Sequence, residues 1–110
     1  MTTITIYKSN ANEYKGFQCF GHAGYADYGK DIICSAISVL VINTINSIEE
    51  LAGVKDSIVD MNEKTGDIKY QLGSIPNEFT TLLLDLMVLG LTKIKEEYGN
   101  KYLKLKFEEV

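Results

Sequence analysis

The segment 32–52, IICSAISVLVINTINSIEELA, constrains the fold of this chain more than any other part of the sequence. Its β-branched residues would suit a strand, but its length and its apolar residues at intervals of three and four favour a helix. Gly53 supplies a stop signal after it, and Asp31 is a plausible N-cap before it. The sequence therefore predicts a helix with one apolar stripe, formed by Ile37, Val41, Ile45, Ile48 and Ala52. The first half of this helix is apolar on almost every side, so we expect it to be buried on more than one side.

Two segments before this helix alternate between apolar and polar residues, as half-buried strands do. They are residues 2–7 and 14–20, and the polar residues between them predict a turn. We therefore predict an N-terminal hairpin. Phe17 and Cys19 share one face of its second strand, and we interpret Cys19 as a core residue.

The chain after this helix predicts a second hairpin and, at its end, one more strand. The hairpin strands are 54–61 and 67–72, which flank the turn NEKTG. The last strand is predicted over 101–107. We expect its apolar side chains to face inward; they are Leu103, Leu105 and Phe107.

A second helix is predicted after Pro76, and it runs to about Tyr98, where Gly99 ends it. We expect its apolar face to consist of Phe79, Leu82, Leu83, Leu86, Leu89 and Ile94. The predicted order is ββαββαβ, an α+β fold with two layers, in which two helices pack on one mostly antiparallel sheet. With 110 residues, the chain is expected to form a single domain over 1–110.

The second predicted helix holds more apolar residues than one stripe against a sheet needs, above all in 82–91, LLLDLMVLGL. Contiguous apolar patches on the surface of a protein often mark partner surfaces. We therefore predict a symmetric homodimer in which helix faces of two chains pack together. The alternative is that the helices pack on each other and on the sheet, with the remaining leucines scattered.

The overall charge limits the classes of partner. The formal net charge is −4, which argues against binding of nucleic acid through a basic surface, although it does not exclude an enzyme that acts on a basic protein. The start of the chain has neither a basic region nor an apolar region of the kind found in signal peptides. The run 82–91 is too short to span a bilayer and carries Asp85, so we expect a cytoplasmic protein that acts without a membrane.

The cysteine and histidine content bears on metals and redox state. Two cysteines in a cytoplasmic protein are expected to be reduced thiols. Together with one histidine they make three candidate ligands, whereas structural zinc sites use four. We therefore expect no metal site and no cofactor.

The stretch 21–36, GHAGYADYGKDIICSA, contains residues that suggest chemistry. It holds His22, the only histidine of the chain, and Cys34, which falls in the first turn of the helix if Asp31 caps it. The positive end of a helix and a nearby imidazolium both favour a thiolate, which is the reactive form of cysteine. The glycines between the two residues permit the chain reversal that would bring them together. Such a Cys–His pair performs acyl transfer on a peptide carbonyl, with the helix start holding the oxyanion.

Each of these residues also has an ordinary structural interpretation. Cys34 at the start of a buried helix can be a small apolar residue, and a lone His22 beside a glycine turn can be a loop residue. Asp31 suits helix capping as well as it suits catalysis. Tyr25 and Tyr28 either pack the loop down or line a substrate cleft.

The stretch 21–38, GHAGYADYGKDIICSAIS, closely resembles the signature of the ribosomal-processing cysteine protease family of Gram-positive and related bacteria. That signature begins Gly-His-Ala and ends Gly-x-Asp-Ile-Val-Cys-Ala-Ala-x-Ser. This chain has Ile33 where Val is common and Ser35 where Ala is common, and neither change removes a reacting group. The resemblance extends to the length and to the predicted elements, so it covers essentially the whole chain.

The resemblance implies an activity and a substrate. Family members remove a short N-terminal extension from a large-subunit ribosomal protein, the one numbered twenty-seven, and they cut after an aromatic residue in a segment like Asn-Leu-Gln-Phe-Phe-Ala. Carried over, Cys34 is the nucleophile, His22 is the base and acid, and Asp31 is a possible third catalytic member. Family members are thought to be homodimers.

The resemblance also suggests residues that contact or admit substrate. Gly21 would be a hinge for the loop, and Ser38 lies one helical turn beyond Cys34. With Tyr25 and Tyr28, these residues form the predicted substrate site. Two other functions remain as hypotheses: a non-catalytic binding module for ribosome assembly, and a redox protein that uses Cys19 and Cys34.

Overall fold

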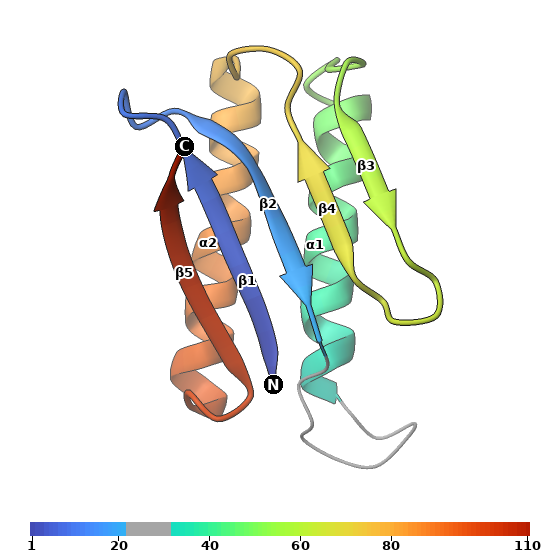
Figure 1. Ribbon diagram of the computed structural model, residues 1–110, viewed down its shortest axis with the longest axis vertical. Coiled ribbons are helices and arrows are strands. Elements are labelled where there is room, and N and C mark those ends of the chain that lie inside the picture. The colour runs from blue at the N-terminus through green and yellow to red at the C-terminus, as the bar shows by residue number, and fades with distance from the viewer. Residues whose placement is uncertain (22–31) are drawn as a thin grey trace.

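The computed structural model describes residues 1–21 and 32–110, and it places two helices on one face of a five-stranded sheet (Figure 1). The predicted order ββαββαβ and the two-layer architecture are confirmed. The elements are β1 Thr2–Lys8, β2 Tyr14–Phe20, α1 Ile32–Glu50, β3 Ile58–Met61, β4 Ile68–Gln71, α2 Glu78–Tyr98 and β5 Leu103–Glu109.

The sheet has the strand order β3-β4-β2-β1-β5. Both predicted hairpins are present, because β1 pairs with β2 and β3 pairs with β4, each antiparallel. The β2–β4 pair is antiparallel as well, whereas β5 runs parallel to β1, so the sheet is mostly antiparallel, as predicted. At the β2–β4 contact, a Cβ atom on Gly16 would lie 2.1 Å from the carbonyl oxygen of Tyr70, so only glycine fits there.

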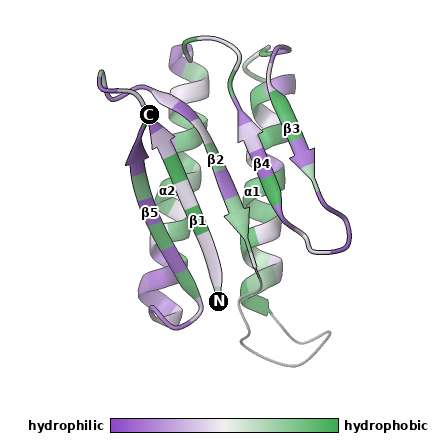
Figure 2. Cartoon of the chain, viewed as in Figure 1, coloured by the Kyte–Doolittle hydropathy of each residue, from purple (hydrophilic) through white to green (hydrophobic). Residues whose placement is uncertain are grey.

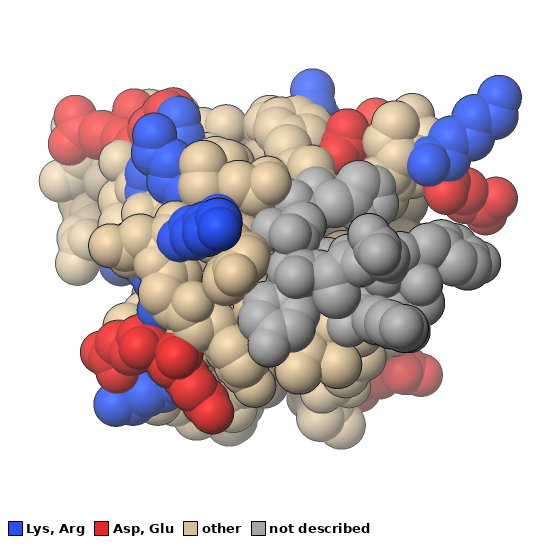
Figure 3. Space-filling view, turned by 90° about the horizontal axis from the view of Figure 1, so that it is seen from below, with Lys and Arg blue, Asp and Glu red and all other residues tan. Residues whose placement is uncertain are grey.

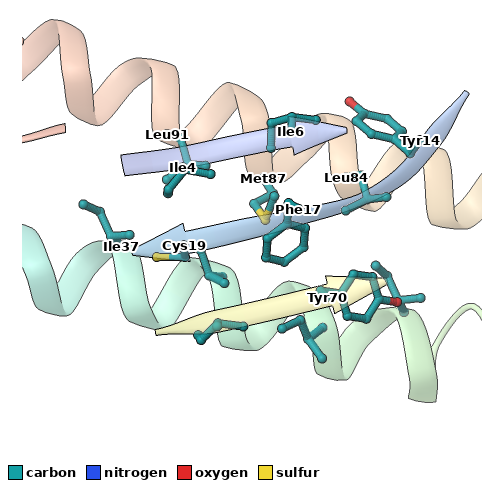
Figure 4. Close-up of a cluster of buried hydrophobic side chains, with 14 of the residues drawn as sticks. Ile4, Ile6, Tyr14, Phe17, Cys19, Ile37, Tyr70, Leu84, Met87 and Leu91 are labelled. Carbon is teal, nitrogen blue, oxygen red and sulfur yellow. The ribbon is translucent and has the colours of Figure 1, made fainter. Parts of the chain in front are cut away.

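The core lies between the sheet and the two helices (Figure 4). From α1 it receives four of the five residues of the predicted apolar stripe, Ile37, Val41, Ile45 and Ile48, which are all buried. The fifth, Ala52, lies after the end of the helix and is half-buried. From the sheet it receives every second residue of the strands, which is the alternation expected of a sheet covered on one face. These residues include Ile4, Ile6, Phe17, Cys19, Ile68 and Tyr70.

The predicted apolar face of α2 is wrong. Phe79, Leu82, Leu86 and Leu89 are between 53% and 64% exposed, and Leu83 and Ile94 are half-buried. The residues of α2 that face the sheet and α1 are instead Thr80, Leu84, Met87 and Leu91. The helix carries two apolar stripes on different sides, and spacing alone cannot tell which of the two a sheet covers.

Two further predictions about burial fail in part. Phe107 is 55% exposed although it was expected to face inward, because β5 is an edge strand and is flanked only by β1. The first half of α1 is buried toward the sheet, and Leu40 and Ile42 also pack half-buried against the core, but Val39 is 69% exposed, so burial does not extend around the helix. Figure 2 shows this helix as apolar over much of its surface near its start.

Several element boundaries also differ from the prediction. The strand predicted over 54–61 begins only at Ile58, and α1 ends at Glu50. The chain then turns through Gly53, which adopts a φ of +73° as a helix stop does. The stop predicted at Gly99 is confirmed, since this residue is the C-cap of α2.

By length and hydropathy alone, α1 would also qualify as a membrane-crossing helix. Core helices of ordinary globular proteins pass the same test. Here the buried stripe of α1 packs against the sheet, and 33% of the apolar window is buried in the described fold.

Candidate active site

The two described ends of the 21–36 stretch lie at the same end of the molecule (Figure 1). Strand β2 ends at Phe20 and leads into Gly21, while α1 begins at Ile32. Figure 3 views this end of the molecule, where charged side chains lie mostly toward the edges and uncharged residues fill much of the remaining described surface.

Cys34 is the third residue of α1 and lies in its first turn. Its neighbour Ile33 and, one turn later, Ile37 are each 1% exposed, and they fix the start of the helix on the sheet. Cys34 packs against this core but stays half-buried, with its thiol free of any disulfide. The sulfur therefore lies at the positive end of a helix, as the sequence predicts.

Ser38 lies four residues after Cys34 and is half-buried too. Residues four apart lie on the same face of a helix, so Ser38 follows the thiol along one side of α1. This position fits a residue that contacts substrate beside the nucleophile, as well as an ordinary polar residue at the border of the core.

Cys19 is a core residue, as predicted. It lies on the inner face of β2 and shares the buried cluster with Ile37 of α1 (Figure 4). Burial raises the pKa of the Cys19 thiol to about 11, and the negative charges of the Cys34 thiolate and of Asp67 add to the effect. The raised pKa leaves Cys19 protonated near neutral pH.

Gly21 has a backbone that other residues rarely adopt, with a φ of +83°. A Cβ atom there would lie 2.7 Å from the carbonyl oxygen of Met1, so glycine is required on steric grounds as well. Its N–H donates a hydrogen bond of 3.1 Å to Oδ1 of Asp67. Asp67 was not among the predicted site residues, because the sequence places it only on the polar side of a strand and does not reveal that β4 lies beside β2.

Four predicted site residues, His22, Tyr25, Tyr28 and Asp31, lie outside the described residues, so their roles stay predictions. Within residues 1–21 and 32–110, no three His, Cys, Asp or Glu side chains gather as metal ligands would. A groove of about 610 Å³ is present elsewhere, lined by Val110 and by residues of β1, β2, β3 and β4 that include Tyr7, Gln18 and Lys69. Its lining contains neither Cys34 nor Ser38.

Comparison with known proteins decides the family. Residues 1–104 match the family model described as cysteine protease Prp. This chain belongs to the cysteine protease Prp family. It is therefore a cysteine protease, and the resemblance found in the sequence is confirmed.

Individual relatives support the assignment over nearly the full length. The ribosomal processing cysteine protease Prp of Bacillus subtilis strain 168 is 26% identical over 102 residues, which cover 89% of this chain and 90% of the relative. The protein of the same name from Staphylococcus aureus strain Mu50 is 26% identical over 108 residues, with coverage of 98% and 100%.

Solved structures have the same fold. The crystal structure of the ribosomal processing protease Prp from S. aureus with a covalently linked product peptide gives a TM-score of 0.86 at 24% identity, covering 98% of this chain and 100% of that one. The crystal structure of SMU.848 from Streptococcus mutans gives a TM-score of 0.85 at 29% identity, with coverage of 100% and 96%.

The difference between the two thiols predicts selective alkylation. With a pKa of about 11, only about one Cys19 thiol in a thousand is ionised at pH 8. Iodoacetamide at pH 8 should therefore modify Cys34 and leave Cys19 unmodified in the folded protein, as measured by peptide mass mapping. Protein unfolded in urea serves as the control, in which both thiols should react. Equal rates of modification in the folded protein would contradict the environment described for Cys19.

Proposed function

We propose that this protein is an endopeptidase that removes the N-terminal extension of the large-subunit ribosomal protein numbered twenty-seven, with Cys34 as nucleophile. The observation that carries the proposal is the position of Cys34, half-buried in the first turn of α1, while the pKa of the second thiol is raised by burial. The relatives named ribosomal processing cysteine protease support the substrate class. We propose that the reaction takes place in the cytoplasm, without a cofactor, a membrane or direct contact with nucleic acid.

The proposed reaction is acyl transfer in two steps. The Cys34 thiolate attacks the carbonyl carbon of the scissile bond, and the positive end of α1 stabilises the oxyanion. The C–N bond then breaks as the His22 imidazolium gives its proton to the leaving amine, which leaves a thioester on Cys34. Water attacks this thioester as His22 takes one of its protons, which restores the imidazolium and expels the Cys34 thiolate. The carboxylic acid that is released gives its proton to the amine product or to solvent and leaves as a carboxylate.

The residues around this pair have proposed roles as well. Asp31 either orients His22 as a third catalytic member or caps α1, and its carboxylate suits both. We propose that the cut follows an aromatic residue, held in a subsite formed by Tyr25, Tyr28 and apolar residues at the start of α1. Ser38 is proposed to contact the substrate beside Cys34. Burial of an aromatic ring contributes roughly 1.5–3 kcal/mol, which is enough to select such peptides.

Replacement of each thiol in turn tests the nucleophile. Cys34→Ser should abolish cleavage of a peptide that contains Asn-Leu-Gln-Phe-Phe-Ala, because a serine hydroxyl at this place does not ionise near neutral pH. Cys19→Ser is the matched control, which should lose some stability and keep the activity. In the same assay, His22→Ala should lower kcat by about 10²–10⁴-fold.

The same assay separates the other hypotheses. A non-catalytic binding module would bind this peptide without cutting it. A redox protein would depend on both cysteines. Activity that survives in Cys34→Ser, or that is lost equally in Cys19→Ser, would contradict the proposed nucleophile. Uncut peptide in the presence of the wild-type protein would contradict the proposed substrate.

The exposed stripe on α2 supports a homodimer. Phe79, Leu82, Leu86 and Leu89 are spaced by three, four and three residues, which is the spacing of the contact seam between two packed helices. Exposed apolar residues in this pattern are complementary to a second copy of themselves, so a two-fold axis satisfies both chains at once. Asp85 interrupts the stripe in sequence, but it is held aside, since its Oδ1 accepts a hydrogen bond of 2.5 Å from the Tyr14 hydroxyl.

A charge placed in this stripe should break the dimer. Leu86→Lys should sediment at micromolar concentration as a monomer of 12.3 kDa, while the wild-type chain sediments at twice that mass. Leu51→Lys is the matched control, because Leu51 is 78% exposed but lies in the turn after α1, off the stripe. A monomeric wild-type chain, or a dimer that survives Leu86→Lys, would contradict this interface.

A further inference from the structure

The residue directly before His22 is held by a side chain from a distant part of the chain. The Gly21 N–H donates to Oδ1 of Asp67 at 3.1 Å, across 46 positions of sequence. Asp67 is half-buried and lies immediately before β4. The function proposed above leaves this contact without a role.

The contact lies where the β2–β4 ladder ends. The last pair of that ladder joins Cys19 to Ile68. The residues beyond this pair are Phe20, the last of β2, and Asp67, which precedes β4. Beyond this pair, the Asp67 carboxylate, and not a backbone carbonyl, accepts the N–H of Gly21. The side chain thus holds the chain at the place where it leaves the sheet toward His22.

Asp67 is itself held by the turn between β3 and β4. Its N–H donates to the Thr65 hydroxyl at 3.2 Å, and its carbonyl oxygen accepts the N–H of Asn62 at 2.9 Å. The Asn62 side chain accepts two further N–H groups of the turn, those of Lys64 and Thr65. These bonds hold the backbone of Asp67 in the turn, and from there its carboxylate reaches the N–H of Gly21.

The backbone of Gly21 is also restricted by its own conformation and by Met1. Its positive φ and the closeness of the Met1 carbonyl oxygen leave the backbone little room to shift. Consecutive Cα atoms are about 3.8 Å apart, so the position and direction of Gly21 determine where His22 begins. A shift of about 1 Å in a catalytic group can lower the rate by about 100-fold.

We propose that Asp67 is a positioning residue for the catalytic histidine, acting through its hydrogen bond to the Gly21 N–H. The inference rests on the proposed function, in which His22 protonates the leaving amine. Asp67 does not touch the substrate in this account. It holds the backbone from which the imidazole is presented to Cys34.

Three variants test whether kcat depends on the hydrogen bond between Gly21 and Asp67 or on the negative charge of Asp67. Asp67→Ala removes the acceptor, and kcat should fall by about 10- to 100-fold with KM within about twofold of wild type. Asp67→Asn keeps an oxygen that accepts the same N–H, and it should restore kcat to within about threefold of wild type. Asp60→Ala, in the neighbouring strand β3, removes an exposed carboxylate of the same hairpin and should have wild-type kcat.

Two results of this assay would overturn the proposal. One is a wild-type kcat for Asp67→Ala, and the other is an Asp67→Asn variant as slow as Asp67→Ala, since a requirement for the charge is not a requirement for this hydrogen bond. Melting curves for all three variants identify any loss of folded protein at the assay temperature, so kcat is compared per folded chain.

A readout without cleavage separates this proposal from the proposed function. If the wild-type protein does not cut the peptide, the proposed function fails, and the rate of Cys34 alkylation by iodoacetamide between pH 5 and pH 9 then decides the role of Asp67. In Asp67→Ala the rise in rate should occur at higher pH than in wild type, because the imidazolium that stabilises the thiolate is displaced. Asp67→Asn should keep the wild-type profile. An unchanged profile in Asp67→Ala would overturn the inference.

Discussion

The packing of α1 on the sheet is the interaction on which the rest of this structure depends. Its buried isoleucines, from Ile33 to Ile48, fix the rotation of the helix about its axis, because only one side can face the sheet. Once Ile33 and Ile37 are buried, Cys34 has to lie at the border of the core, half-buried at the positive end of the helix. The same residues that stabilise the fold therefore determine how the thiol is presented.

The sheet also constrains the positions of Cys19 and Gly21. Strand β2 places Cys19 in the core and ends beside β4, where Asp67 holds Gly21. The hairpin of β3 and β4 thus contacts one end of the 21–36 stretch, from which it is far in sequence. Cys34 comes from a helix, and Gly21, the residue before His22, is held beside the sheet. In the proposed mechanism, the geometry of the Cys34–His22 pair therefore depends on how the two layers pack.

Much of the fold could be predicted from the sequence, because the periodicity of apolar residues is strong within single helices and strands. The α1 stripe, the two hairpins and the buried Cys19 follow from the periodicity of apolar residues. The inner face of α2 could not be predicted, since Leu82 and Leu84 are equally apolar and only the tertiary structure decides that Leu84 is the buried one. The contact between Asp67 and Gly21 could not be predicted for a related reason: the pairing of β2 with β4 joins two hairpins, and no local pattern specifies it.

The central claim is that the Cys34 thiol, presented by the first turn of α1, forms the covalent bond to the substrate. The most direct test is labelling with a peptidyl chloromethyl ketone that ends in Phe, followed by peptide mass mapping and an activity assay. The account predicts one label per chain, on Cys34, with complete loss of cleavage and with Cys19 unmodified. A label on Cys19, or full activity in protein labelled at Cys34, would contradict it.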